Sequence, residues 1–160
     1  IAPLNYYGYT KAQAEEKISS NFPHALIIRS SSFFGPWDKY NFAYDVISQL
    51  KNKNTFRAAD DISVSPTYVP HLVDASLDLL IDKEIGIWHI TNDGKSSWAE
   101  FAIQLAERGG LSKSHIIKCP QQEMNWKAIR PSFSALRSER GIKLPALGKA
   151  IDCFFEQKIY

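Results

Sequence analysis

The feature that most constrains the fold is a continuous apolar run followed by a loop of small residues. In the stretch HALIIRSSSFFGPW, residues 25–28 are all apolar, and the loop after them stops at Gly35-Pro36. Such a run is typical of a strand that is buried on both faces, as the strands of parallel sheets are. We therefore predict a parallel strand over residues 24–30, which requires neighbouring strands on both sides.

Helical and extended patterns alternate along the rest of the chain. We expect helices from about residue 6 to 22 and at 42–52, 71–82, 96–110 and 146–157. The helix at 96–110 has the clearest signals, because Ser97 and Glu100 have capping-box spacing and Gly109-Gly110 provides a stop. Short strands or extended segments are expected at 55–58, 62–69, 86–92 and 115–119, and an irregular, binding-loop-like stretch at 121–136.

This alternation predicts an α/β protein with parallel pairing, organised as a single domain over residues 1–160. Three or four short strands are too few for a complete sheet. We therefore expect strands 24–30 and 86–91 to be parallel members of one sheet. The remaining strands would lie outside this chain or come from a second copy of it, since an open edge invites pairing and hence a homodimer. The start at Ile1, directly before a helix, also suggests a fragment.

Composition excludes several classes of protein. The chain is 44% hydrophobic and 22% charged, and its net charge of +2 is scattered, so neither a nucleic acid nor an anionic membrane is indicated as a partner. No apolar run approaches the ~20 residues of a membrane span. Cys119 and Cys153 lack CxxC spacing and the four histidines form no ligand pattern, so no metal site is expected. We expect a soluble, cytoplasmic protein.

A tyrosine and a lysine stand four residues apart in YYGYTK. Tyr7 and Lys11 lie one turn apart on the same face of the expected helix, where both can meet one substrate. A free tyrosine has a pKa near ~10 and exchanges protons poorly at neutral pH unless a nearby cation favours the phenolate. Lys11 is placed to be that cation. The alternative is an ordinary surface pair that matches this short pattern by chance.

Four ordered blocks give the pattern a family context: PLNYYGYTKAQAE, LIIRSSSFFGPWDKYNF, DDISVSPTYVPHLVDA and IRPSFSAL. Together they resemble the RmlD-like extended short-chain dehydrogenase/reductases, the dTDP-4-dehydrorhamnose reductase family, from residue 3 to about 155. The resemblance implies the carboxyl-terminal part of a Rossmann-like fold, with its last parallel strands and a small substrate-binding subdomain.

The resemblance also implies an activity, the reduction of a nucleotide-sugar ketone by NADPH or NADH. In that family the tyrosine protonates the ketone oxygen as hydride arrives, while the lysine lowers the pKa of the tyrosine and binds the nicotinamide ribose. These roles would fall to Tyr7 and Lys11. Ser30, Ser31 and Ser32 would contact nicotinamide and sugar at the carboxyl end of their strand; the alternative is a plain connecting loop.

Four further positions match the family on its nucleotide-sugar side. They are Asn41, Pro66, Thr67 and Arg130, and the guanidinium suits a diphosphate through bidentate hydrogen bonds. For each of them a structural role is the alternative.

Several positions depart from the family pattern. Ser32 stands where rhamnose-pathway reductases tend to carry a tryptophan, and Ile62 and Val64 replace a glutamine and a glycine, which leaves the sugar open. No Gly-rich strand–turn–helix for the cofactor pyrophosphate occurs in these residues. The resemblance therefore implies an amino-terminal Rossmann half outside this chain, and the chain alone is expected to bind the cofactor poorly.

Two other functions remain open at this stage. A nucleotide-sugar epimerase or dehydratase shares the extended fold, although the additional acid/base residues that such enzymes use near the tyrosine are not visible. A noncatalytic, reductase-like regulatory subunit could keep the Tyr7/Lys11 pair without using it.

Overall fold

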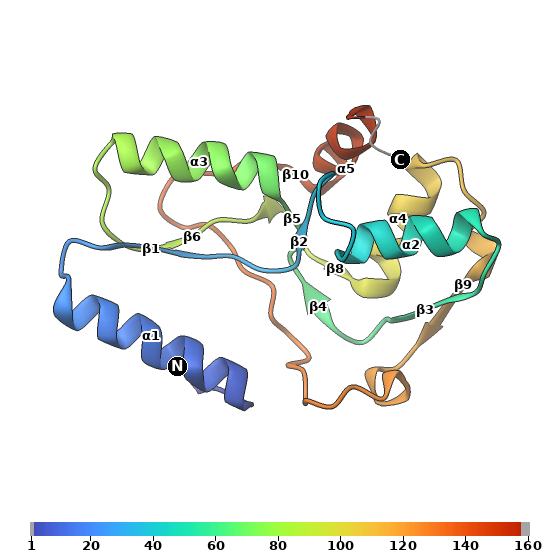
Figure 1. The fold of residues 1–160 in the computed structure, drawn as a ribbon, viewed down its shortest axis with the longest axis horizontal. Coiled ribbons are helices and arrows are strands. Elements are labelled where there is room, and N and C mark those ends of the chain that lie inside the picture. Colours follow the sequence, from blue (N-terminus) through green and yellow to red (C-terminus); the bar gives the residue numbers. More distant parts are fainter. Residues whose placement is uncertain (1, 158–160) are drawn as a thin grey trace.

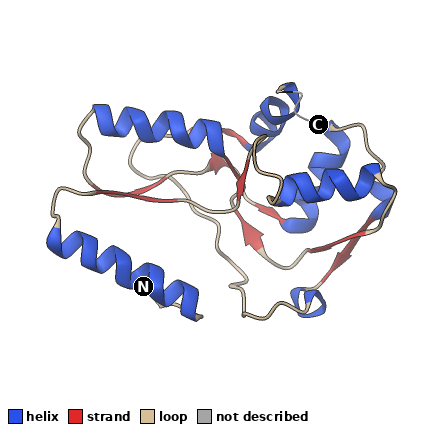
Figure 2. Cartoon of the chain, viewed as in Figure 1, coloured by secondary structure: helices blue, strands red, loops and turns tan. Residues whose placement is uncertain are grey.

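The computed structural model describes residues 2–157 as a mixed α/β structure (Figures 1 and 2). The α-helices are α1 (Tyr6–Asn21), α2 (Phe42–Lys51), α3 (Val69–Ile81), α4 (Trp98–Arg108) and α5 (Leu147–Glu156). The strands are β1 (Leu26–Arg29), β2 (Phe33–Phe34), β3 (Phe56–Ala59), β4 (Ser63–Val64), β5 (Thr67–Tyr68), β6 (Gly86–His89), β7 (Asn92–Asp93), β8 (Ser96–Ser97), β9 (Ile116–Cys119) and β10 (Leu144–Ala146). Two short 3₁₀ helices, η1 (Lys113–His115) and η2 (Gln121–Met124), flank β9.

The two strands that were predicted to share one sheet pair as expected. β1 and β6 are parallel, in a register that runs from Leu26 opposite Gly86 to Arg29 opposite His89. Within residues 2–157 this sheet holds two strands, so the outer edge of each strand has no strand partner. The alternation of apolar strands and helices was therefore sufficient to predict the parallel pairing.

Helices α3 and α1 lie on opposite sides of the β1–β6 pair in Figure 1, but they pack differently. Ala75 and Leu79 of α3 are buried with Trp88 of β6 in one hydrophobic cluster. In contrast, no residue of α1 is buried, and its apolar residues Ala14 and Ile18 are exposed. The prediction of a helix is confirmed, but these apolar side chains have no covering element in the described chain.

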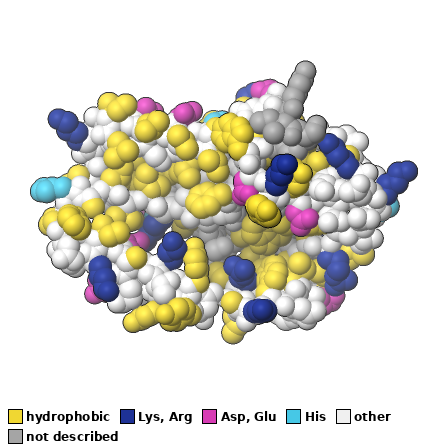
Figure 3. Space-filling view, viewed as in Figure 1, with side chains coloured by type: hydrophobic (Ala, Val, Ile, Leu, Met, Phe, Trp, Pro, Cys, Tyr) yellow, Lys and Arg dark blue, Asp and Glu magenta, His cyan; other side chains and the backbone are white. Residues whose placement is uncertain are grey.

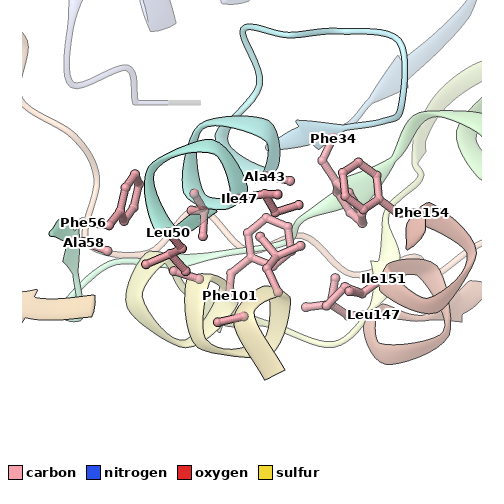
Figure 4. Close-up of a cluster of buried hydrophobic side chains, with 14 of the residues drawn as sticks. Phe34, Ala43, Ile47, Leu50, Phe56, Ala58, Phe101, Leu147, Ile151 and Phe154 are labelled. Carbon is pink, nitrogen blue, oxygen red and sulfur yellow. The ribbon is translucent and has the colours of Figure 1, made fainter. Parts of the chain in front are cut away.

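The main core lies in the other half of the molecule, where α2, α4 and α5 meet. Figure 4 shows Phe34, Phe101 and Phe154 among its side chains, and the ring of Phe34 lies 5.1 Å from Phe101 and 5.7 Å from Phe154, centroid to centroid. These aromatic contacts are edge-on, the arrangement that ring quadrupoles favour. The predicted capping box of α4 is present, with both the Ser97 and the Glu100 hydrogen bonds formed.

Short strand pairs join the two halves. β2 is parallel to β5, β7 is parallel to β10, and β4 is antiparallel to β8, while β3 and β9 form a separate parallel pair beside α4. The predicted strand 86–92 is interrupted, because residues 90 and 91 separate β6 from β7. The irregular stretch predicted at 121–136 is confirmed from residue 125 onward, where no helix or named strand occurs up to residue 143, whereas residues 121–124 form η2. No described helix is both long and apolar enough to cross a bilayer.

Candidate functional site

Tyr7 and Lys11 occupy the first two turns of α1 and face the same way. The Lys11 ammonium lies 5.6 Å from the centroid of the Tyr7 ring, and 69% of the Tyr7 residue surface is exposed. The cation therefore sits over the aromatic face, a contact that attracts it electrostatically. The structure confirms the one-turn geometry inferred from the spacing, and it leaves both functional groups accessible.

Asn5 holds the first turn of α1 in place. Its side-chain oxygen caps the helix by accepting a hydrogen bond from the Gly8 amide at 2.8 Å, and its Nδ2 donates to the Ile129 carbonyl at 2.9 Å. The cap satisfies an otherwise unpaired backbone donor. Ile129 directly precedes Arg130. Asn5 therefore links the helical turn that carries Tyr7 to the loop that carries the predicted diphosphate contact.

The Ser30–Ser32 loop follows β1 and contacts the segment before α3. Ser30 Oγ lies 3.3 Å from Thr67 Oγ1, Ser31 Oγ donates to the Ser65 carbonyl, and the Ser32 carbonyl accepts from the Thr67 amide at 3.1 Å. Ser32 has φ of 53°, a left-handed conformation that is uncommon outside glycine. The structure thus brings the predicted serines and Thr67 together.

Asn41 and the Pro66–Thr67 pair are largely committed to the fold. The Asn41 side chain donates to the carbonyls of Gly35 and Asp38 and accepts from the Tyr44 amide, which makes it the N-cap of α2. Thr67 is fully buried and its hydroxyl donates to Ser65, while Pro66 is among the most buried residues. Their predicted contact with a substrate stays a prediction.

Arg130 lies on the irregular segment and is exposed. Its guanidinium carbon is 5.6 Å from the centroid of the Trp126 ring, and no carboxylate within residues 2–157 forms an ion pair with it. A guanidinium supported by an aromatic ring and free of an acidic partner is available to an anion. The surface is hollowed near the middle of the face in Figure 3, and Lys and Arg side chains lie around the hollow.

Two clefts lie beside the predicted site residues, one next to Asn41 and one along α1. One, of about 270 Å³, is lined by Phe33, Phe34, Gly35, Trp37, Asp38, Asn41 and Val69. The other, of about 470 Å³, runs along α1 beside Tyr9, Glu15 and neighbouring residues. Sequence reasoning did not single out Phe33 or Trp37, whose rings are half to two-thirds exposed next to Asn41. Their place directly after the serine loop is the signal that could have identified them.

Sequence reasoning also missed the ion pair between Arg29 and Glu15, which connects α1 to the sheet. Arg29, the last residue of β1, donates hydrogen bonds from Nε and Nη2 to the two carboxylate oxygens of Glu15, the first at 2.8 Å. The hydrogen bond from Arg29, assisted by its charge, lowers the pKa of the Glu15 carboxyl despite partial burial. The available signal was the position of Glu15, one turn beyond Lys11.

Comparison with known proteins gives these residues a context. The family model described as the RmlD substrate binding domain matches residues 1–150. The chain belongs to this family. Membership confirms the resemblance carried by the four sequence blocks, and with it the α/β class and the Rossmann-like relationship of the fold.

Individual relatives support the same family membership. The chain is 33% identical over 143 residues to the spore coat polysaccharide biosynthesis protein SpsK of Bacillus subtilis, covering 89% of this chain and 49% of that protein. It is 28% identical over 139 residues to a dTDP-4-dehydrorhamnose reductase of Mycolicibacterium smegmatis, covering 86% of this chain and 42% of the relative. The chain therefore spans about half the length of the curated relatives it matches.

A solved structure extends the likeness to three dimensions. The chain superimposes with a TM-score of 0.92 and 25% identity on a dTDP-4-dehydrorhamnose reductase of Bacillus anthracis in complex with NADP, covering 98% of this chain and 57% of that one. The arrangement of β1, β6 and their helices is thus that of an RmlD structure, although the rest of that structure has no counterpart in these residues.

Proposed function

We propose that this chain is the substrate-binding portion of an NAD(P)-dependent nucleotide-sugar reductase, and that it supplies the general acid for ketone reduction on a deoxysugar like that of dTDP-4-dehydrorhamnose. The observation that carries the proposal is the Tyr7–Lys11 pair, exposed on α1 with its ammonium 5.6 Å from the ring centroid. Membership of the RmlD family and relatives named as dTDP-4-dehydrorhamnose reductases support it.

Tyr7 is the proton donor in this proposal. When the ketone carbon is reduced, its oxygen takes the proton of the Tyr7 hydroxyl, and the nearby Lys11 charge favours the resulting phenolate. The exposed first turn of α1 allows a sugar carbonyl to approach the hydroxyl. A general acid so placed contributes a factor on the order of 10²–10⁴ to the rate.

The residues present fit one end of a nicotinamide cofactor, which supplies the hydride when bound. The Lys11 ammonium has no carboxylate partner among the described residues, so it is free to bind a ribose hydroxyl, and the serine hydroxyls lie at the carboxyl end of β1. The residues to cradle the cofactor pyrophosphate are not among them, because no Gly-rich turn opens a helix here. We infer that an amino-terminal half provides that part.

Arg130 is the proposed anchor for the substrate diphosphate. Its guanidinium has five donors in a planar fork that matches phosphate oxygens, and no acid within residues 2–157 competes for them. The Asn5–Ile129 hydrogen bond sets the loop beside the Tyr7 turn. One substrate could therefore meet Tyr7 with its sugar and Arg130 with its diphosphate.

Product analysis tests the proposal. A full-length protein that contains this chain, supplied with dTDP-4-dehydrorhamnose and NADPH, is expected to form one sugar alcohol for each NADPH oxidised. Formation of a sugar isomer or a dehydrated sugar without net NADPH oxidation would instead identify an epimerase or a dehydratase. No turnover of any nucleotide sugar, together with a stoichiometric protein partner, would identify a regulatory subunit.

A further inference from the structure

Helix α1 carries the proposed proton donor, yet hydrophobic packing does not hold it. None of its 16 residues is buried, and Tyr6, Tyr9 and Ile18 are all more than 40% exposed. Most helices in proteins are stabilised and oriented by an apolar face packed against the core. Within residues 2–157, the contacts that set the rotation of α1 about its axis are therefore mainly polar.

Glu15 makes the central polar contact. It lies one turn beyond Lys11 and two turns beyond Tyr7, so the three side chains share one face of α1. Both carboxylate oxygens of Glu15 accept hydrogen bonds from Arg29, and only 16% of its side-chain surface is exposed. A bidentate pair of this kind constrains both the distance and the orientation of its partners.

Arg29 extends this contact to the second strand. Its Nη1 donates to Nε2 of His89 at 3.2 Å, and because a guanidinium has no acceptor, His89 must accept through that nitrogen. Arg29 and His89 face each other at the carboxyl ends of β1 and β6. The next residue after Arg29 is Ser30, where the serine loop begins, so the ion pair joins the Tyr7–Lys11 helix to the base of that loop.

We propose that Glu15 is a positioning residue: through Arg29 it sets the rotation and height of α1, and so places Tyr7 and Lys11 relative to Ser30–Ser32. The inference rests on the proposed function, since it gives the placement a catalytic purpose. Reacting groups must be held within a fraction of an ångström, and a misplacement of about 1 Å can cost on the order of 10² in rate. The Glu15–Arg29 contact can thus affect the reaction rate without touching the substrate.

The first test measures the helix itself, in the 160-residue chain. Glu15→Gln keeps the shape of the side chain but removes its charge, and hydrogen exchange of the α1 amides is expected to accelerate at least about tenfold. Amides of α4, which packs in the main core, should be affected much less. The matched control is Glu16→Gln, because Glu16 is exposed and its carboxylate contacts only Gln13 within the described residues; it should leave α1 unchanged.

The second test measures catalysis in a full-length protein that contains this chain. Glu15→Gln is expected to lower kcat about ten- to a hundredfold while the KM for the nucleotide sugar changes less than about twofold, since no substrate contact is lost. The exchanged pair, Glu15→Arg with Arg29→Glu, should recover part of kcat and of the α1 protection. A role in general stability would not produce this separation of kcat from KM.

Different outcomes overturn the positioning role and the proposed function. Unchanged α1 exchange in Glu15→Gln, an equal effect of Glu16→Gln, or no recovery in the exchanged pair would each overturn the positioning role. If the wild-type full-length protein reduces no nucleotide sugar, the proposed function fails, while the exchange measurement still decides whether Glu15 holds α1.

Discussion

At the scale of single residues, the hydrogen bonds already made within the chain separate available side chains from committed ones. Asn41 uses its side-chain donors and its acceptor on the loop around it, and Thr67 is buried. Tyr7, Lys11 and Arg130 are exposed, and no ion pair engages either cation within residues 2–157. Chemistry with an external ligand is therefore best sought at these three.

The first prediction concerns the proton donor. In a full-length protein containing this chain, Tyr7→Phe removes one hydroxyl and keeps the ring under Lys11, so turnover should fall on the order of 10²–10⁴-fold. The affinity for NADPH, measured by fluorescence titration, should hardly change. Lys11→Met should reduce both turnover and cofactor affinity, because the lysine has two tasks. A fully active Tyr7→Phe protein would remove Tyr7 from the mechanism.

The second prediction concerns the diphosphate. Arg130→Ala should raise the KM for the nucleotide sugar more than it lowers kcat, with a loss of about ten- to a hundredfold in kcat/KM, since a hydrogen bond to a charged group contributes ~1.5–3 kcal/mol. Arg57→Ala is the control, because Arg57 is an exposed arginine on β3 that pairs with Glu123. Steady-state kinetics that are equal for the two variants would exclude Arg130 from the site.

The third prediction concerns a residue of the core. Tyr68 is almost fully buried, its hydroxyl has no hydrogen-bond partner within residues 2–157, and burial raises its pKa to about 12. Tyr68→Phe removes this unsatisfied group and keeps the ring contact with Phe34, so the free energy of unfolding should rise by about 1 kcal/mol. Urea denaturation of the two chains measures the difference. A destabilised variant would show that the hydroxyl has a partner in solution.

At the scale of secondary structure elements, the two helices beside the β1–β6 pair are held by different forces. Helix α3 buries Ala75 and Leu79, so it is held by the hydrophobic effect, which is insensitive to pH. Helix α1 buries no residue and depends on the Asn5 cap and on the Glu15–Arg29 ion pair. Of these two helices, α1, which carries the proposed catalytic residue, is therefore the one whose attachment depends more on charged side chains.

The fourth prediction follows from the pKa of Glu15. Because Arg29 lowers this pKa in the folded chain, the ion pair stabilises the fold above the unfolded-state pKa, and its contribution disappears as the pH falls through the lower, folded-state value. The stability difference between wild type and Glu15→Gln should therefore shrink as the pH falls from about 7 to about 3.

Urea denaturation at several pH values measures this difference. Glu16→Gln should show no such pH dependence, because Glu16 makes no ion pair within the described chain. A difference between wild type and Glu15→Gln that stays constant with pH would mean that the ion pair does not form in solution.

At the scale of the whole molecule, the main hydrophobic core and the β1–β6 sheet differ in how complete they are within residues 2–157. The core among α2, α4 and α5 is dense with aromatic residues, whereas the β1–β6 sheet has an open edge within residues 2–157. The RmlD reductase of Bacillus anthracis extends well beyond the matched region. This asymmetry fits a substrate-binding portion that works with a separate cofactor-binding half.

The fifth prediction tests that division. The 160-residue chain alone should bind NADPH poorly, because it lacks a helix N-terminus with a Gly-rich turn for the pyrophosphate. Fluorescence titration of NADPH into the chain should show little binding, while a full-length protein that contains it should bind in the usual micromolar range or tighter. Equally tight binding by the isolated chain would refute the proposed division of labour.

Much of the local structure, including the geometry of the Tyr7–Lys11 pair, could be predicted from the sequence alone. Apolar runs and capping signals depend on neighbours in the chain, so the strand at 24–30, the capped helix α4 and the one-turn spacing of Tyr7 and Lys11 could all be predicted. The four motif blocks likewise carried the family.

Which polar groups meet across the fold could be learned from the three-dimensional arrangement alone. Glu15 and Arg29 are ordinary charged residues in the sequence, and their pairing depends on how α1 lies against β1. The commitment of Asn41 to its own loop and the exposure of Ala14 and Ile18 on α1 could not be predicted from the sequence either. Contacts between distant segments and burial depend on the position of the whole chain in space, which no local pattern encodes.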